Sequence, residues 1–197
     1  MTFFRRDIEE CLSKNKYDLE FITPPLNKEV QFMKISVIGS GYVGSVTAAC
    51  FAELGHEVIC LDIDKRKTDL INEGIPPIYE EGLGELLQKH AGKNLTATTD
   101  YESAIRKTDI SFICVGTPSA EDGSIDLSIV RAATTSIGTV LAKKEGYHVV
   151  VVKSTVVPET TEKFVIPLLE ESSGKIAGKD FGVAMNPEFL REGKAVY

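Results

Sequence analysis

The sequence lacks the cysteine patterns that hold structural metals or disulfide frameworks. Its four cysteines, Cys11, Cys50, Cys60 and Cys114, include no CxxC pair, and no histidine stands near them at the spacing of a zinc ligand. Zinc sites and small disulfide-stabilised domains both depend on such spacings. We therefore expect a protein without a metal site and without a disulfide framework.

Long apolar runs and an excess of basic residues are also missing. No run approaches the roughly 18 apolar residues that indicate a membrane-spanning helix. Residues 1–32 mix basic and acidic side chains, which is typical of neither a signal peptide nor an acid-poor transit peptide. With 22 Lys+Arg against 29 Asp+Glu, the net charge of −7 disfavours nucleic acid and anionic membranes as partners. A cytoplasmic protein is the default expectation.

The 197 residues have the composition of an ordinary globular domain, with 43% hydrophobic and 26% charged residues. From residue 34 onward, apolar runs of strand length alternate with stretches of helical length. Strands are expected at 34–38, 56–62, 95–98, 110–115, 149–152 and 182–185. This alternation predicts an α/β fold with a doubly wound, mostly parallel sheet and helices on both faces. Residues 1–32 are expected to form a separate extension with a short helix and a linker, and residues 33–197 the α/β domain.

A glycine-rich segment follows the first expected strand directly. Residues 39–44, GSGYVG, fit the GxGxxG pattern and open the first expected helix. In this pattern the first glycine permits a tight turn, the second lets the backbone approach a pyrophosphate, and the third allows close packing of helix and strand. Asp62 ends the second expected strand, where a carboxylate can accept hydrogen bonds from ribose hydroxyls. Together these features predict a Rossmann-type dinucleotide site, against the alternative of an ordinary glycine turn.

The charges around Asp62 bear on the choice of dinucleotide. A carboxylate at this place would repel the 2′-phosphate of NADP, so NAD is favoured. The basic residues 65–67 follow the same strand and could receive such a phosphate, so NADP stays open as the alternative.

Three more segments follow expected strands: residues 114–118 (CVGTP), 153–158 (KSTVVP) and 186–193 (NPEFLREG). In a parallel sheet they would all emerge at the carboxyl edge, beside the cofactor crevice. Cys114 continues an apolar run, which indicates a buried structural thiol rather than a nucleophile. A pair of glutamates four residues apart, such as Glu188 and Glu192, is usually a solvated surface, so the residues alone do not establish catalysis.

These segments, with LDID at 61–64 and NEGIPPIYEEGL at 72–83, resemble in order and spacing the UDP-glucose/GDP-mannose dehydrogenase family over residues 33–196. The resemblance implies an oxidoreductase that uses two NAD⁺ and water to convert C6 of a nucleotide sugar from alcohol to carboxylate. UDP-glucose, giving UDP-glucuronate for polysaccharide biosynthesis, is the favoured substrate, and GDP-mannose is the alternative. A non-catalytic NAD(H)-binding module is an interpretation of a different class.

The resemblance also implies roles for single residues. Those placed along the NAD are Gly39, Gly41, Tyr42, Val43, Gly44, Asp62, Lys67, Val115, Thr117, Thr155 and Glu192. Glu188 would be the acid/base carboxylate for hydrolysis of a thioester, with Thr155 helping to hold the water. The loop over the sugar nucleotide would consist of Glu188, Phe189, Leu190, Arg191 and Glu192.

Some features of the family pattern are not found in these residues. The family's nucleophilic cysteine, a catalytic lysine and an asparagine come from regions after NPEFLREG, and its members dimerise through a helix there. We therefore expect a truncated product or a fragment, inactive by itself and either monomeric or paired with a missing half. Glu81 stands where the family usually has proline. Glu159 stands where it usually has glycine, adding negative charge near the crevice.

Overall fold

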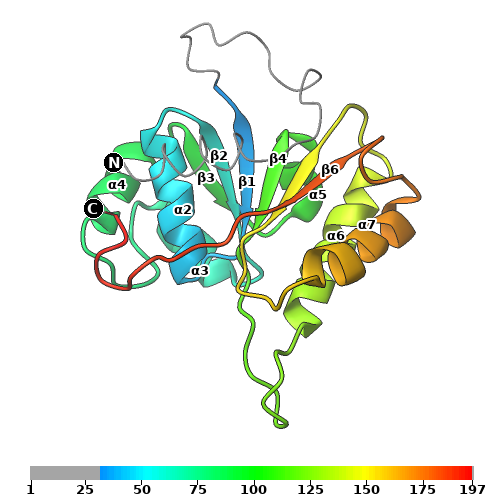
Figure 1. Cartoon of the computed structure of the whole chain (residues 1–197). Helices are drawn as coiled ribbons and strands as arrows, with labels where there is room; N and C mark the ends of the chain where they lie inside the picture. Colours follow the sequence, from blue (N-terminus) through cyan, green and yellow to red (C-terminus); the bar gives the residue numbers. More distant parts are fainter. Residues whose placement is uncertain (1–31, 197) are drawn as a thin grey trace, which may run out of the picture. The chain divides into compact units, whose positions relative to one another are not determined.

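The computed structural model describes residues 32–196, which form an α/β unit around a six-stranded parallel sheet (Figure 1). The strands are β1 (Lys34–Ile38), β2 (Glu57–Leu61), β3 (Leu95–Thr98), β4 (Ile110–Ile113), β5 (Val149–Val152) and β6 (Gly182–Met185). All six coincide with the expected strands to within two residues at each end. The helix and linker predicted for residues 1–32 lie outside the described residues, except for Phe32.

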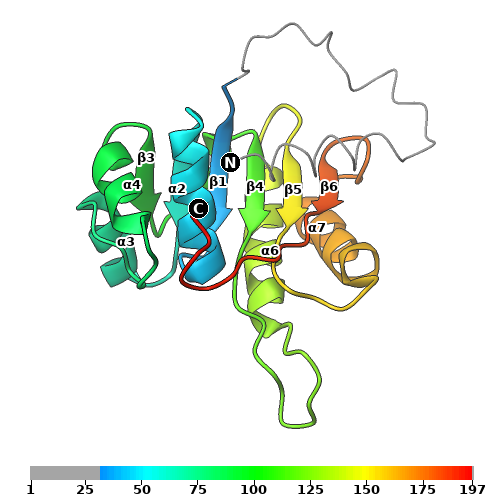
Figure 2. The same cartoon turned by 60° about the vertical axis from the view of Figure 1, so that its left-hand side comes forward.

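The strand order β3-β2-β1-β4-β5-β6 is that of a doubly wound sheet. All five neighbouring pairs are parallel, so the carboxyl ends of the strands share one edge, which lies at the bottom of Figure 2. The chain turns from one half of the sheet to the other between β1 and β4. In open sheets of this kind, ligands bind at the carboxyl edge where the strand order reverses.

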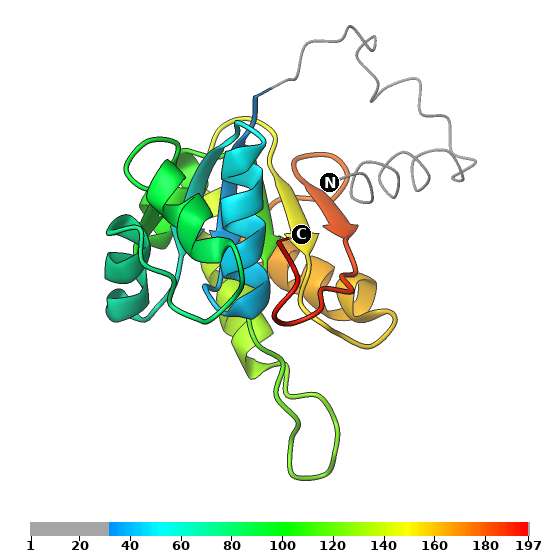
Figure 3. The same ribbon diagram turned by 90° about the vertical axis from the view of Figure 1, so that its left-hand side faces the viewer.

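Helices cover both faces of the sheet, as Figure 3 shows from the side of α2. They are α2 (Tyr42–Glu53), α3 (Lys65–Asn72), α4 (Leu83–His90), α5 (Tyr101–Arg106), α6 (Ser128–Leu141), a short π-helical turn η2 (Thr161–Val165) and α7 (Ile166–Ser173). Buried residues of α2, α3 and α4 share one apolar cluster with the sheet. Buried residues of α5, α6 and α7 share the other. The predicted fold class is thereby confirmed.

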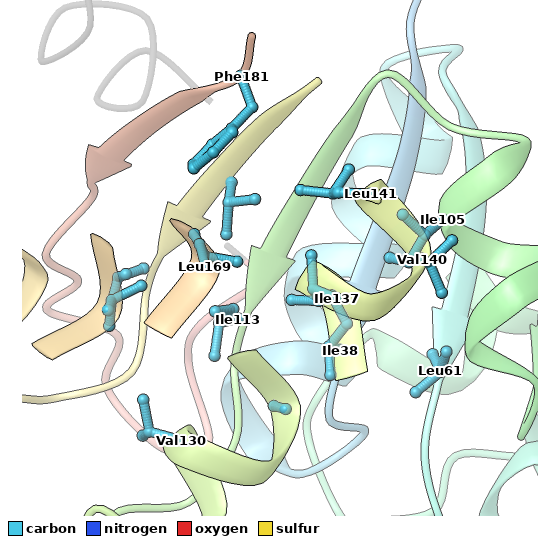
Figure 4. Packing of buried hydrophobic residues seen from close by; sticks show 14 of the residues in the cluster. Ile38, Leu61, Ile105, Ile113, Val130, Ile137, Val140, Leu141, Leu169 and Phe181 are labelled. Atoms are coloured by element: carbon cyan, nitrogen blue, oxygen red, sulfur yellow. The ribbon is translucent and has the colours of Figure 1, made fainter. Parts of the chain in front are cut away.

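The core follows from apolar strands buried on both faces. In β1, Ile35 and Val37 belong to the cluster on the α2 side, whereas Ile38 belongs to the cluster on the α6 side. Figure 4 shows this second cluster, in which Ile137 and Leu141 of α6 point toward the sheet. These two side chains are at most 1% exposed, so their burial fixes α6 against the strands that carry the site.

The helix starts differ in a way that matters for function. Asp64 begins α3 by accepting a hydrogen bond from the backbone N–H of Arg66, and Asp100 begins α5 in the same way. In contrast, α2 follows Gly41 without any side-chain cap. The first N–H groups of α2 are therefore left for a ligand at the carboxyl edge of the sheet.

Candidate dinucleotide site

The three glycines of the GSGYVG loop have three different surroundings. Gly39 has a φ of +98°, and a Cβ there would lie 2.7 Å from the carbonyl oxygen of Cys114. A Cβ on Gly44 would lie 1.7 Å from the carbonyl oxygen of Gly39. A Cβ on Gly41 would meet no atom within 4 Å. Gly39 and Gly44 thus let chain segments pack, whereas Gly41 borders open space in front of α2, where a pyrophosphate can approach the backbone.

Asp62 lies at the end of β2 with its carboxylate held against the glycine loop. Its Oδ2 accepts hydrogen bonds from the Ser40 backbone N–H at 2.7 Å and from the Ser40 hydroxyl at 2.5 Å. Its Oδ1 accepts one from the Asp64 N–H at 2.9 Å. Burial alone would raise the pKa of Asp62, but these bonds and the charge of Lys67 lower it below its usual value. The site therefore keeps a fixed negative charge where the ribose hydroxyls of a dinucleotide would lie.

The three basic residues after β2, at positions 65–67, do not form one cationic cluster. Lys65 pairs with Asp69 at 2.7 Å, and Arg66 pairs with Asp64 at 2.9 Å. Lys67 alone of the three lines the cavity beside the glycine loop, with its Nζ 3.9 Å from Asp62 Oδ2. Two of the three basic side chains that could receive a 2′-phosphate are therefore already paired with acidic side chains, which favours NAD over NADP.

A cavity of about 490 Å³ opens at the reversal point of the sheet. The loops after β1, β2 and β4 line it, together with Tyr101 of α5 and the first turns of α6. Burial and the charge of Asp62 raise the pKa of Tyr101 to about 12, so its hydroxyl stays protonated. A largely apolar cavity with a few polar groups and an open helix start fits a dinucleotide.

The structure brings five of the predicted cofactor residues to this cavity: Gly39, Gly41, Asp62, Lys67 and Val115. Other predicted cofactor residues have different surroundings. Gly44 is buried under the loop, and Val43 packs against the α2-side core. The Tyr42 hydroxyl lies beside Glu80, whose carboxylate together with burial raises the pKa of Tyr42 to about 12. Thr117 follows Gly116 just beyond the residues that line the cavity.

The predicted sugar-side residues lie after β5 and β6. Thr155 is exposed and Glu188 is partly exposed, and no hydrogen bond joins them within the described residues. Glu188 Oε2 accepts the Leu190 N–H at 2.6 Å, which shapes the start of the loop. Phe189 is 95% exposed. These side chains therefore follow the carboxyl ends of β5 and β6, at the same edge of the sheet as the glycine loop.

Sequence reasoning assigned no individual role to several polar residues near these sites. Lys153 is only 2% exposed and donates a hydrogen bond to Asn186 Oδ1 at 3.0 Å, which links the end of β5 to the segment after β6. Burial lowers the pKa of Lys153, while Cys114 and Glu188 oppose that shift. Ser40, inside the GSGYVG segment, and Tyr101 were also given no role of their own. A lysine directly after the apolar run VVVV was the available signal, whereas nothing local marked Tyr101.

The three cysteines that the structure describes are free thiols of low reactivity. Burial raises the pKa of Cys60 far above its usual value and that of Cys114 to about 12, and it also raises the pKa of the half-buried Cys50. A nucleophilic cysteine needs the opposite shift. The prediction that Cys114 is a buried structural thiol is consistent with its exposure of 6%.

Two kinds of feature are absent from residues 32–196. None of the helices described there combines the length and apolarity needed to cross a membrane. The His, Cys, Asp and Glu side chains of the same residues form no group of three or more that could hold a metal ion.

Comparison with known proteins supplies the family. The family model for the NAD-binding domain of the UDP-glucose/GDP-mannose dehydrogenase family matches residues 33–197. The chain is 54% identical over 164 residues to UDP-glucose 6-dehydrogenase AglM of Haloferax volcanii. It is also 54% identical over 166 residues to GDP-mannose 6-dehydrogenase of Pseudomonas syringae pv. syringae. Each alignment covers 83% of this chain and 38% of the relative, so the chain spans about two fifths of their length.

Solved structures agree with these sequence matches. A ternary complex of GDP-mannose dehydrogenase from Pseudomonas aeruginosa superposes with a TM-score of 0.82 at 50% identity, covering 83% of this chain and 38% of that one. A UDP-glucose dehydrogenase from Pyrobaculum islandicum superposes with a TM-score of 0.81 at 42% identity, covering 88% and 40%. The chain therefore belongs to the UDP-glucose/GDP-mannose dehydrogenase family, and residues 33–197 match its NAD-binding domain.

Proposed function

We propose that this chain holds NAD for the oxidation of C6 of a nucleotide sugar to a carboxylate. The observation that carries the proposal is the cavity at the reversal point of the sheet, where the open space at Gly41 lies beside the fixed carboxylate of Asp62. When bound there, NAD⁺ would supply the hydride acceptor. The chain's own contribution is to bind the dinucleotide and to orient it at the carboxyl edge of the sheet.

Within this proposal the segments after β5 and β6 face the sugar. Glu188 would accept the proton of the water that hydrolyses an acyl intermediate, and Thr155 would help to hold that water. Phe189, Leu190, Arg191 and Glu192 would contact the nucleotide sugar, with Glu192 also reaching the nicotinamide end. Support comes from the family match and from the position of both segments after the carboxyl ends of β5 and β6.

The described cysteines bear on what this chain can do by itself. Each has a raised pKa, so none of them is suited to form a covalent thioester. We expect the 197-residue chain to bind NADH and to produce no NADH from NAD⁺ and UDP-glucose. Dimerisation and a role in polysaccharide biosynthesis belong to the same proposal and rest on the sequence resemblance. A cytoplasmic location is also proposed, from the mixed charges of residues 1–32.

UDP-glucose is the first substrate to test, and GDP-mannose is the second. Gly193 after NPEFLRE favours UDP-glucose, whereas relatives named for either substrate match this chain at 54% identity. The substrate is therefore a question for competition between the two nucleotide sugars. A non-catalytic NAD(H)-binding module is the alternative of a different class, because the dinucleotide cavity alone would serve it equally well.

Calorimetric titration of the purified chain tests the proposal. NADH and NADPH are titrated separately into the chain, and UDP-glucose or GDP-mannose is then added to the NADH complex. Saturable binding of NADH, tighter than that of NADPH, is the expected result. A folded chain that binds neither dinucleotide would overturn the proposal. Co-purification with a partner that supplies the missing half would favour the binding module, and production of NADH by the chain alone would contradict the expected inactivity.

A further inference from the structure

Residues 75–83 belong to a segment that resembles the family but has no role assigned so far. This segment contains a buried carboxylate. Glu80 is 4% exposed, although its neighbour Tyr79 is 90% exposed and Glu81 is also at the surface. The chain then turns at Gly82, whose φ is +80°, to begin α4. A single acidic side chain is thus directed inward from an otherwise exposed loop. Burying a charge in this way is costly unless hydrogen bonds satisfy it.

Both oxygens of Glu80 are satisfied by the backbone of a segment far along the chain. Oε2 accepts the Gly193 N–H at 2.6 Å, and Oε1 accepts the Ala195 N–H at 2.7 Å. These donors lie 113 and 115 residues away in sequence. Residues 191–194 form a turn, which is closed by a hydrogen bond from the Lys194 N–H to the Arg191 carbonyl at 3.0 Å. Gly193 within this turn has a φ of +82°. Charge-assisted bonds to two N–H groups of one turn fix both its position and its orientation.

The same carboxylate faces the dinucleotide loop on its other side. Tyr42, the first residue of α2, places its buried hydroxyl beside Glu80. Glu80 thus lies between the GSGYVG loop and the turn that follows Glu192. Figure 2 shows the chain after β6 crossing the carboxyl edge of the sheet toward α2. Burial by itself would raise the pKa of Glu80, but the N–H groups of Ala195 and Gly193 and the Tyr42 hydroxyl lower it.

We infer that Glu80 is a positioning residue, which docks the turn at residues 191–195 beside the dinucleotide loop and so sets where Arg191 and Glu192 lie. The inference rests on the proposed function, in which those two side chains face the nucleotide sugar. The NEGIPPIYEEGL segment thereby gains a role. It supplies the Glu80 carboxylate, whose hydrogen bonds hold the turn at residues 191–195 beside the GSGYVG loop. The exposed Tyr79 and Glu81 are not needed for that role.

Hydrogen–deuterium exchange of the 197-residue chain, read by mass spectrometry, tests the inference. In Glu80→Gln the side chain keeps its size but has only one acceptor oxygen for the two N–H groups. Amides of residues 190–196 should then exchange roughly tenfold faster or more, while those of α6 stay unchanged. Glu80→Asp retains the carboxylate and should recover part of the protection. Glu81→Gln removes the same charge from the neighbouring exposed position and should behave as wild type.

A second variant approaches the same contact from the other partner. Ala195→Pro removes one donor without altering Glu80, and it should also speed exchange around Gly193. Unchanged exchange in both Glu80→Gln and Ala195→Pro, or equal acceleration throughout the chain, would overturn the inference. NADH affinity is measured in the same samples: wild-type protein that fails to bind NADH contradicts the proposed function, whereas normal NADH binding with unchanged exchange contradicts only the role of Glu80.

Discussion

The two edges of the sheet both bury polar side chains, but they do so in different ways. At the amino edge, Ser36, Ser111 and His148 form a chain of hydrogen bonds of 2.6 and 2.7 Å, and Thr108 joins it through Ser36. At the carboxyl edge, Asp62 is held by loop N–H groups beside a cavity. The amino-edge groups satisfy one another, whereas the carboxyl-edge groups leave a helix start and a carboxylate facing open space.

A second hollow, larger than the cavity beside the glycine loop, shows the same difference. A pocket of about 710 Å³ lies between the loops that lead into β5 and β6, and four lysines are among the residues lining it. Two of these lysines are committed to the fold: Lys144 donates to the Ile105 carbonyl at 2.7 Å, and Lys175 donates to the Lys144 carbonyl at 2.6 Å. Size alone therefore does not identify the site. Unused backbone donors beside a fixed charge identify it better.

The largest expected effect comes from substituting two glycines of the same loop and comparing the results. Gly44→Ala should lower the free energy of unfolding by about 3 kcal/mol or more, because the methyl group would overlap the Gly39 carbonyl oxygen. Gly41→Ala should change stability by no more than about 1 kcal/mol, yet weaken NADH binding roughly tenfold by occupying the pyrophosphate space. Denaturant unfolding and NADH fluorescence titrations measure both. Wild-type NADH affinity in Gly41→Ala would break the contrast.

The amino-edge network predicts a pH dependence of stability. Burial and the nearby charge of Lys144 lower the pKa of His148 to about 3. The unfolded chain therefore binds a proton that the folded chain excludes between about pH 6.5 and pH 3, so stability falls as the pH falls through that range. The slope should reach about 1.4 kcal/mol per pH unit.

Urea unfolding at a series of pH values measures that slope. His148→Gln cannot titrate and should lose this contribution while retaining a hydrogen-bonding side chain. NADH affinity at pH 7 should be the same in both proteins, since His148 lies at the other edge of the sheet. A slope that survives in His148→Gln would assign the effect to other groups.

At the carboxyl edge, a single charge should change the affinity for the dinucleotide. Asp62→Asn removes the negative charge but keeps the size of the side chain, and we expect roughly tenfold weaker NADH binding. Binding of NADPH should weaken less, because the repulsion of a 2′-phosphate disappears. Asp69→Asn makes the same charge change on the exposed face of α3 and serves as the control. Equal losses in the two variants would argue against a ribose contact at Asp62.

The smallest expected effect concerns a backbone position after β5. Glu159 has a φ of +69° and is the only described residue other than glycine with a positive φ. Glu159→Gly should stabilise the fold by up to about 1 kcal/mol, because glycine adopts this conformation without steric cost. The lost contact to Lys163 is exposed and counts for little. Glu162→Gly, within η2, should instead destabilise, and thermal unfolding of the two variants distinguishes these outcomes.

Much of the architecture could be predicted locally. Apolar runs of strand length, separated by stretches of helical length, indicated all six strands, and the GSGYVG segment indicated where α2 (Tyr42–Glu53) begins. The glycine loop and Asp62 were recognisable because a helix start beside a strand end needs those residue types in that order. The sequence favoured NAD and left NADP open as the alternative. The match to an NAD-binding domain supports NAD, and the pairing of Lys65 and Arg66 with acidic neighbours agrees with it.

What the sequence by itself determined is therefore the order of the elements, the two apolar faces of the sheet and the glycine loop that follows the first strand. These depend on periodicity and on glycines, whose effects act over a few residues. Only the tertiary structure decided that Glu80 meets Gly193 and Ala195, that Lys153 meets Asn186, and that Tyr101 faces the cavity. The physical reason is that hydrogen bonds and cavities join whichever groups packing brings together, and separation along the chain carries no information about them.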